Sequence, residues 1–158
     1  MSIFVTGGTG FLGSYVIPEL LSQPTQRVTV FTRAQNRQQA VDKLWKNLQL
    51  HWSADEYFMA LPRIDFALGD LHADGLGLSD TDRGRIRRDV TSVLHIAASL
   101  NRKSNKACLN TNLRGTLSVI KLARELADAG RLRRFSHVST VAGCGHRQDE
   151  EVSEDESI

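Results

Sequence analysis

The feature that most constrains this chain is a glycine-rich loop close to its start. Residues 3–6 form a short apolar, β-branched run that leads directly into TGGTGFLG at residues 6–13. From Phe11 to Leu21 apolar residues recur at helical spacing, which predicts a helix directly after the loop. The pattern therefore predicts a strand, a tight glycine turn and a helix, in that order.

Each glycine of the pattern has an expected task. Gly7 allows a sharp turn with positive φ, Gly10 allows the backbone to approach a pyrophosphate, and Gly13 allows the helix to pack on the strand. The backbone N–H groups at the amino end of the helix stabilise an anion there, and a threonine hydroxyl adds a donor. The sequence thus predicts a dinucleotide site, with contacts from Thr6, Gly7, Thr9, Gly10, Phe11, Leu12 and Gly13.

The rest of the chain alternates between strand and helix patterns. Further strands are expected at Arg27–Thr32, Ile64–Leu68, Val90–Ile96 and Phe135–Ser139, and helices at Gln35–Leu50 and Ala107–Ala129. Such alternation predicts an α/β fold with a doubly wound parallel sheet of the Rossmann type, because each return to a parallel strand needs a crossover. We expect residues 1–148 to form this domain. Residues 149–158 are expected to be a disordered acidic tail.

The composition argues against several function classes. The net charge is only +2 and the basic clusters are interrupted, so no nucleic-acid partner is expected. The start of the chain does not read as a signal peptide, and no apolar run is long enough for a membrane helix, so we expect a cytoplasmic protein that does not bind a membrane. Cys108 and Cys144 lack a CxxC spacing and the histidines do not cluster, so neither a metal site nor a disulfide framework is expected.

The end of the second predicted strand bears on which nucleotide binds. An NAD-binding chain usually has an acidic residue there, for the ribose diol. This chain has Arg33, and no carboxylate occurs from Gln23 to Val41. An arginine fork suits a 2′-phosphate, with help from Arg37, so the sequence predicts NADP rather than NAD as the cofactor.

Five spaced motifs resemble those of the extended short-chain dehydrogenases/reductases. They are TGGTGFLG at 6–13, GDL at 69–71, HIAA at 95–98, NLRGT at 112–116 and VSTVAGCG at 138–145. Three features resemble the thioester reductase and fatty acyl-CoA reductase branch of this group. They are the arginine after the second strand, the stretch containing WKNLQLHW and the sequence HIAASLN. The resemblance covers essentially the whole chain.

The resemblance implies further cofactor contacts. Asp70 is expected to accept a hydrogen bond from the adenine amino group, with the Leu71 backbone beside it; a purely structural turn aspartate is the alternative. Ala97 and Ala98 have side chains small enough for the cofactor to lie against the backbone. His95 is expected to be a structural histidine.

The resemblance also implies catalytic residues. Thr140, with Ser139 as its reserve, is expected to donate a hydrogen bond to the substrate carbonyl. Asn112 is expected to hold a water of the proton relay; the alternative is an asparagine that bonds neighbouring backbone. The family's Tyr-x-x-x-Lys pair does not occur, since no tyrosine follows Tyr57 and no lysine follows Lys121.

The expected function follows from these assignments. The chain is expected to be the NADP(H)-binding part of an oxidoreductase that acts on a thioester, either acyl-CoA or a carrier-bound acyl group, and to be inactive alone. We expect five strands in the order 3-2-1-4-5, without the C-terminal substrate-binding part. Two alternatives stay open: a nucleotide-sugar epimerase or dehydratase fragment, and a non-catalytic NADP-binding module. A fragment of a longer reductase is favoured because Asn112 and Thr140 are retained.

Overall fold

The computed structural model describes residues 1–101, 103–140, 145, 151 and 153. Its centre is a five-stranded parallel sheet with the order β3-β2-β1-β4-β5. The strands are β1 (Ser2–Thr6), β2 (Arg27–Thr32), β3 (Ile64–Leu68), β4 (Val90–His95) and β5 (Arg134–His137). This order confirms the predicted Rossmann-type fold.

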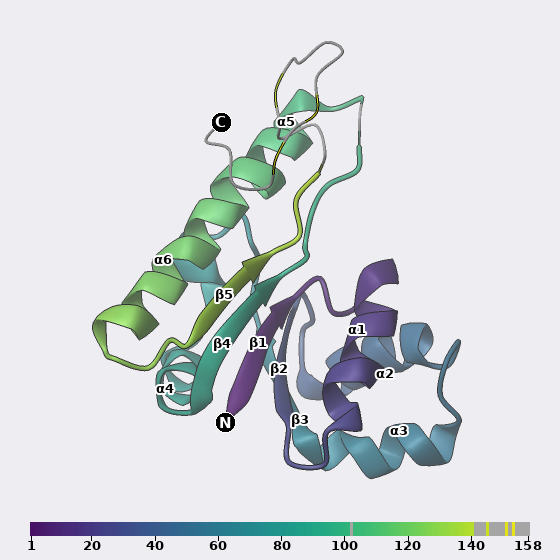
Figure 1. Ribbon diagram of the computed structural model, residues 1–158. Helices are drawn as coiled ribbons and strands as arrows, with labels where there is room; N and C mark the ends of the chain where they lie inside the picture. The colour runs from purple at the N-terminus through teal and green to yellow at the C-terminus, as the bar shows by residue number, and fades with distance from the viewer. Residues whose placement is uncertain (102, 141–144, 146–150, 152, 154–158) are drawn as a thin grey trace.

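Helices cover both faces of the sheet (Figure 1). One face carries α1 (Phe11–Ser22), α2 (Arg37–Leu48) and α3 (Ala54–Ala60), and the other carries α4 (Asp80–Asp89) and α6 (Thr116–Asp128). Short helical segments complete the chain: η1 (Leu61–Arg63), η2 (Asp74–Gly77), α5 (Asn105–Cys108) and the π-helical η3 (Leu109–Gly115). The two layers of helices explain why the strands are apolar on both faces.

Adjacent residues of the central strands pack into two separate hydrophobic cores, one on each face of the sheet. Val5 and Val30 pack in one cluster with side chains of α1, α2 and α3, whereas Phe4 and Phe31 pack in the other with side chains of α4 and α6. The alternation follows from strand geometry, in which successive side chains point to opposite faces. The sheet is therefore held rigidly from both sides, and its carboxyl edge forms a firm base for a site.

Two helices, α3 and α4, were not predicted from apolar periodicity. Helix α3 has seven residues, and α4 contributes Ile86 as its fully buried side chain, so neither carries a long apolar stripe. Polar signals mark both starts. Ser53 forms a capping box with Glu56, and the Ser79 hydroxyl oxygen accepts a hydrogen bond from the Asp82 N–H. Capping residues would have located both helices where periodicity could not.

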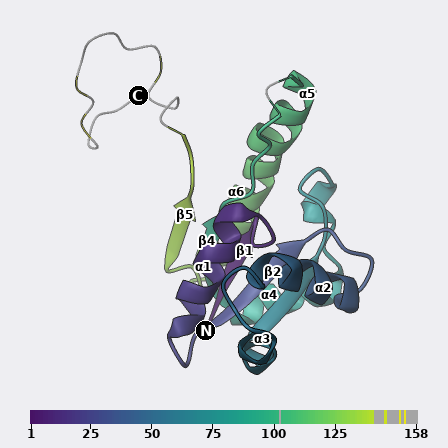
Figure 2. The same cartoon turned by 90° about the vertical axis from the view of Figure 1, so that its right-hand side faces the viewer.

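The single long helix predicted at Ala107–Ala129 is in fact composed of three helical segments. It begins as α5, widens into the π-helical η3 and continues as α6. In both views the α5 end extends beyond the carboxyl ends of the strands (Figures 1 and 2). Turns of π-helix are rare in proteins, and those that occur are often found at functional sites. This irregularity therefore indicates a functional site at the carboxyl edge of the sheet.

Some sequence predictions lie outside the described residues. These are the domain boundary at residue 148 and, apart from Glu151 and Ser153, the acidic tail. In the part of the chain that the structure describes, no helix has both the length and the apolar character needed to cross a membrane.

Candidate functional site

The loop between β1 and α1 makes the tight turn that its glycines predict. Gly7 has a φ angle of 75°, and a Cβ there would lie 2.7 Å from the backbone nitrogen of Ala97. A Cβ on Gly13 would lie 2.4 Å from the carbonyl oxygen of Gly8. The Gly10 N–H donates to the Gly7 carbonyl oxygen at 3.0 Å, which closes the turn. Because these neighbours are backbone atoms, a side chain at Gly7 or Gly13 would displace the loop itself.

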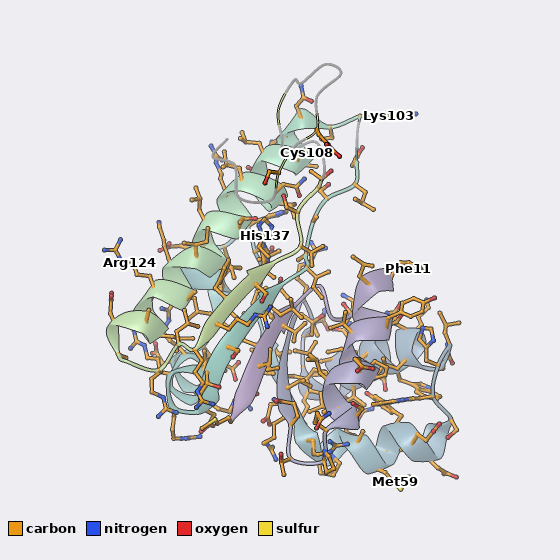
Figure 3. The ribbon with its side chains drawn as sticks, in the orientation of Figure 1. Phe11, Met59, Lys103, Cys108, Arg124 and His137 are labelled. Atoms are coloured by element: carbon orange, nitrogen blue, oxygen red, sulfur yellow. The ribbon has the colours of Figure 1, made fainter. Side chains whose placement is uncertain are left out.

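The amino end of α1 presents backbone donors to a ligand. Gly10 occupies the N-cap position without a capping side chain, and the first turn contains no acidic residue. The first helical hydrogen bond is donated by the Ser14 N–H, so the N–H groups of residues 11–13 have no acceptor within the helix. Figure 3 shows Phe11 at this end of α1. An anion here meets a partial positive charge with no competing carboxylate from the first turn.

A cleft of about 650 Å³ opens beside this loop, at the carboxyl edge of the sheet. It lies where the chain order reverses between β1 and β4, which is where open α/β sheets bind ligands. Its lining contains most of the predicted site residues, namely Gly7, Thr9, Gly10, Phe11, Leu12, Arg33, Asp70, Leu71, Ala97, Ala98 and Ser139. The structure thus brings together residues from the segments that follow all five strands.

Other lining residues were not predicted: Phe31, Thr32, Lys43, His72, Ile96, Ser99, Leu100, Thr111 and Val138. Several of them directly flank predicted residues at strand ends, so the strand assignments already contained a signal for them. Lys43 and Thr111 lie in helix α2 and in the π-helical η3, far in sequence from the predicted site residues of the other loops, and only the tertiary fold brings them to the cleft.

Lys43, and not Arg37, accompanies Arg33 in the cleft lining. The Lys43 ammonium donates to the Arg33 carbonyl oxygen at 3.0 Å. The Arg37 guanidinium instead donates to the Ile64 carbonyl oxygen at 3.5 Å and lies 5.4 Å from the centre of the Phe66 ring. Lys43, six residues after Arg37 on α2, is therefore the cation that lies beside Arg33 at the cleft.

The loop after β3 brings Asp70 to the cleft through a local turn. The Asp70 Oδ1 atom accepts a hydrogen bond from the His72 N–H at 2.9 Å, as in an Asx turn. The His72 ring is linked in turn to the Thr111 hydroxyl at 2.9 Å. A Cβ on Gly69 would lie 2.2 Å from the Leu76 carbonyl oxygen, so this position of GDL requires glycine. Asp70 has the turn role of the alternative interpretation while it also lines the cleft.

Thr6 and His95 lie beneath the cleft rather than on its lining. The Thr6 hydroxyl accepts a hydrogen bond from the Ala97 N–H at 3.3 Å and lies 2.6 Å from His95 Nδ1. His95 Nε2 lies 2.9 Å from the Thr116 hydroxyl. Both Thr6 and His95 are fully buried. They join β1, β4 and α6 directly below the backbone of Ala97.

Burial keeps the His95 ring neutral. Loss of solvation, together with a smaller effect of the stacked His137 ring whose centre lies 5.0 Å away, lowers its pKa from the usual 6.5 to about 4. A neutral imidazole has one donor nitrogen and one acceptor nitrogen, which the two threonine hydroxyls satisfy. His95 therefore has the contacts of a structural histidine.

Asn112 lies in the π-helical η3 and binds backbone. Its Oδ1 atom accepts a hydrogen bond from the Ser99 N–H at 2.7 Å, and its Nδ2 donates to the Ser99 carbonyl oxygen at 3.1 Å. The side chain is exposed. These two bonds hold the segment that follows Ala98, so the backbone-bonding alternative describes what Asn112 does in this structure.

The segment after β5 brings one of the two predicted hydroxyls to the cleft. The Val138 N–H donates to the His95 carbonyl oxygen at 2.9 Å, which continues the pairing of β5 with β4. Ser139 and its neighbour Thr140 are both exposed, and Ser139 lines the cleft whereas Thr140 does not. Ser139, the second choice from the sequence, thus lies nearer to the cleft than Thr140 does.

Sheet order, glycine loop and cleft together define a nucleotide-binding protein of the Rossmann class. The family model described as Male sterility protein, an NAD-binding family, matches residues 5–157. This chain belongs to that family. Within the extended short-chain dehydrogenases/reductases it lies in the thioester reductase and fatty acyl-CoA reductase branch.

Three similar proteins illustrate the relationship. The terminal R domain from the myxalamid PKS-NRPS biosynthetic pathway superposes with a TM-score of 0.85 at 27% identity, over 99% of this chain and 39% of that domain chain. The nonribosomal peptide synthetase malG of Malbranchea aurantiaca is 32% identical over 97% of this chain and 7% of its own length. Fatty acyl-CoA reductase wat of Drosophila melanogaster is 29% identical over 94% of this chain and 29% of its own length. This chain therefore spans less than half of each.

Proposed function

We propose that this chain is the NADP(H)-binding part of a reductase that acts on a thioester, either acyl-CoA or an acyl group on a carrier. The observation that carries the proposal is the cleft at the switch point of the sheet, which combines the glycine loop, the small residues Ala97 and Ala98, and the cations Arg33 and Lys43. The similarity to a nonribosomal peptide synthetase and to a fatty acyl-CoA reductase supports a thioester as the substrate.

Each part of the cleft fits one part of the dinucleotide. The amino end of α1 suits the pyrophosphate, because its N–H groups and dipole favour an anion. Asp70 and Leu71 suit the adenine, and Ala97 and Ala98 leave room for the nicotinamide half against the backbone. When bound, NADPH supplies a hydride for the thioester carbonyl carbon.

A hydroxyl beyond β5 assists the reaction in this proposal. Ser139 at the cleft, or Thr140 beside it, donates a hydrogen bond to the carbonyl oxygen as negative charge develops there. Asn112 positions the Ser99 backbone that lines the same end of the cleft. These 158 residues contain no Tyr-x-x-x-Lys pair, so the proposal assigns them cofactor binding and not turnover.

The preference for NADP over NAD depends on two cations. Arg33 and Lys43 belong to the same end of the cleft, since the lysine ammonium bonds the arginine carbonyl. In the described part of the chain neither side chain forms an ion pair with an acid. A planar guanidinium and an ammonium close together suit a 2′-phosphate.

Titration of the 158-residue protein with NADPH and NADH tests the proposal. We expect Arg33→Ala and Lys43→Ala each to raise the Kd for NADPH roughly tenfold, as expected for the loss of one charge-assisted hydrogen bond, and to change the Kd for NADH less than about twofold. Arg37→Ala is the matched control, because this arginine contacts Ile64 and Phe66 and does not line the cleft. Tighter binding of NADH than of NADPH by the unaltered protein would contradict the assignment.

A further inference from the structure

Helix α2 contacts the glycine loop through Asn47, a residue that does not line the cofactor cleft. The Asn47 side-chain amide donates a hydrogen bond to the Thr9 carbonyl oxygen at 2.6 Å, and it also donates to the Lys43 carbonyl oxygen at 3.3 Å. Thr9 and Lys43 line the cleft, whereas Asn47 is half-buried and lies outside the lining. One side chain thus connects the anion-binding loop with the helical turn that carries a cation.

A second contact reinforces this connection one turn further along the chain. His51 Nε2 lies 3.2 Å from the Ser14 hydroxyl, and the His51 ring centre lies 4.3 Å from that of Tyr15. The Ser14 hydroxyl in turn donates to the Phe11 carbonyl oxygen at 2.7 Å. The region of α2 and the turn after it therefore contacts both the loop and the first turn of α1.

The peptide group between Thr9 and Gly10 is held at both ends. Its carbonyl oxygen accepts from Asn47, and its N–H donates to the Gly7 carbonyl oxygen at 3.0 Å. An accepting carbonyl points at its donor, so the Thr9 oxygen is directed at α2. If this oxygen turned into the cleft, its partial negative charge would face the anion that the loop binds.

We propose that Asn47 is a positioning residue for the cofactor, which holds the Thr9 carbonyl away from the pyrophosphate and so keeps the glycine loop in its binding form. This inference rests on the proposed function, because it concerns the same dinucleotide. It adds that α2 serves both phosphate groups: Lys43 contacts the 2′-phosphate, and Asn47, four residues later, shapes the pyrophosphate loop from behind.

The test compares two ligands that share the adenine and the 2′-phosphate. NADPH contains the pyrophosphate and 2′-AMP does not. Asn47→Leu removes the amide donor and keeps a side chain of similar size. We expect it to raise the Kd for NADPH roughly three- to tenfold, which corresponds to the loss of one hydrogen bond, while the Kd for 2′-AMP changes less than about twofold.

Gln49→Leu is the matched control. The Gln49 amide, at the C-cap of α2, donates to the Lys46 carbonyl oxygen at 3.0 Å, a local side-chain bond to the helix backbone like that from Asn47 to Lys43. No bond from the Gln49 side chain to the glycine loop occurs among the described residues. We expect this variant to leave both Kd values unchanged. Asn47→Asp is the second test variant if Asn47→Leu does not fold, because a carboxylate has the shape of the amide but cannot donate to the Thr9 carbonyl oxygen.

The outcomes separate this inference from the proposed function. If the unaltered protein binds NADPH but Asn47→Leu binds it equally well, or loses NADPH and 2′-AMP by the same factor, Asn47 has no positioning role. A lower melting temperature with an unchanged Kd for NADPH has the same meaning. If the unaltered protein binds neither NADPH nor 2′-AMP, the proposed function is wrong and the inference is overturned with it.

Discussion

The two edges of the sheet use their charged residues differently. At the amino edge, a hollow of about 340 Å³ is lined by two ion pairs: Arg27 lies 3.3 Å from Asp65, and Arg88 lies 3.0 Å from Asp89. The further cation of this lining, Arg131, donates to the Arg88 carbonyl oxygen. At the carboxyl edge, the cleft of about 650 Å³ contains Arg33 and Lys43, whose cations have no acidic partner among the described residues.

The difference shows which edge is built for a ligand. Paired charges at the ends of strands satisfy each other and leave little attraction for an ion from solution. The carboxyl edge combines cations without an acidic partner, backbone N–H groups without an acceptor in their helix, and glycines that bring backbones together. The concave shape is common to both edges, so shape alone would not have distinguished them.

The largest expected effect comes from the glycine loop. Gly13→Ala places a Cβ 2.4 Å from the Gly8 carbonyl oxygen, so the loop has to move. We expect a loss of about 2–3 kcal/mol in the free energy of unfolding and at least a roughly tenfold rise in the Kd for NADPH. Urea unfolding and NADPH titration measure the two effects.

Gly84→Ala is the control for this substitution. Gly84 is exposed inside α4, and a Cβ there would meet nothing within 4 Å. Because alanine favours a helix over glycine, we expect a gain of about 0.5–1 kcal/mol and no change in the Kd. If Gly13→Ala were as stable as the unaltered protein, the prediction would be wrong, because the loop would then accommodate the Cβ without a loss in the free energy of unfolding.

The next effect is a dependence of stability on pH that comes from His95, below the carboxyl edge. In the unfolded chain the His95 ring binds a proton as the pH falls through about 6.5. In the folded protein the pKa of this ring is about 4, so the ring stays neutral until the pH is much lower. The unfolded state therefore binds more protons between these values, and the folded state loses stability as the pH falls. We expect a loss of about 2 kcal/mol between pH 7 and pH 5.

His95→Asn removes the titrating ring and is the comparison for this measurement. Its free energy of unfolding is expected to be lower at pH 7, because hydrogen bonds to Thr6 and Thr116 are lost or lengthened. Between pH 7 and pH 5 it is expected to vary less than that of the unaltered protein. Parallel pH profiles for the two proteins would rule out His95 as the source of the dependence.

The smallest expected effect lies at the amino edge. Arg27→Gln breaks the ion pair with Asp65, in which the two side chains are 46% and 26% exposed. Exposed pairs contribute little, so we expect a loss of less than about 1 kcal/mol and no change in the Kd for NADPH. A clear rise in this Kd would mean that the two edges are not independent, and the contrast between them would need revision.

Most of the fold could be predicted from local sequence patterns. The glycine loop, the β-branched runs and the helical periodicity located the strands and several helices, since these are properties of short segments. The sheet order was implied by the resemblance to the short-chain dehydrogenases/reductases, and the structure confirms it. The patterns failed for α3 and α4, which bury too few side chains to form an apolar stripe and whose starts are marked by capping residues. They also predicted one regular helix where η3 widens the backbone, because periodicity does not report the type of helical turn.

The sequence alone determined that this chain forms a Rossmann-type sheet with a nucleotide loop at its start, and that Arg33 follows the second strand. Only the tertiary structure decided that Lys43 replaces Arg37 beside that arginine, that Asn47 reaches the loop, and that Thr6 lies below the cleft. The physical reason is the distance along the chain over which each kind of interaction acts. Turns, caps and periodicity depend on neighbours in the chain, whereas these side chains meet partners from separate elements only once both faces of the sheet are packed.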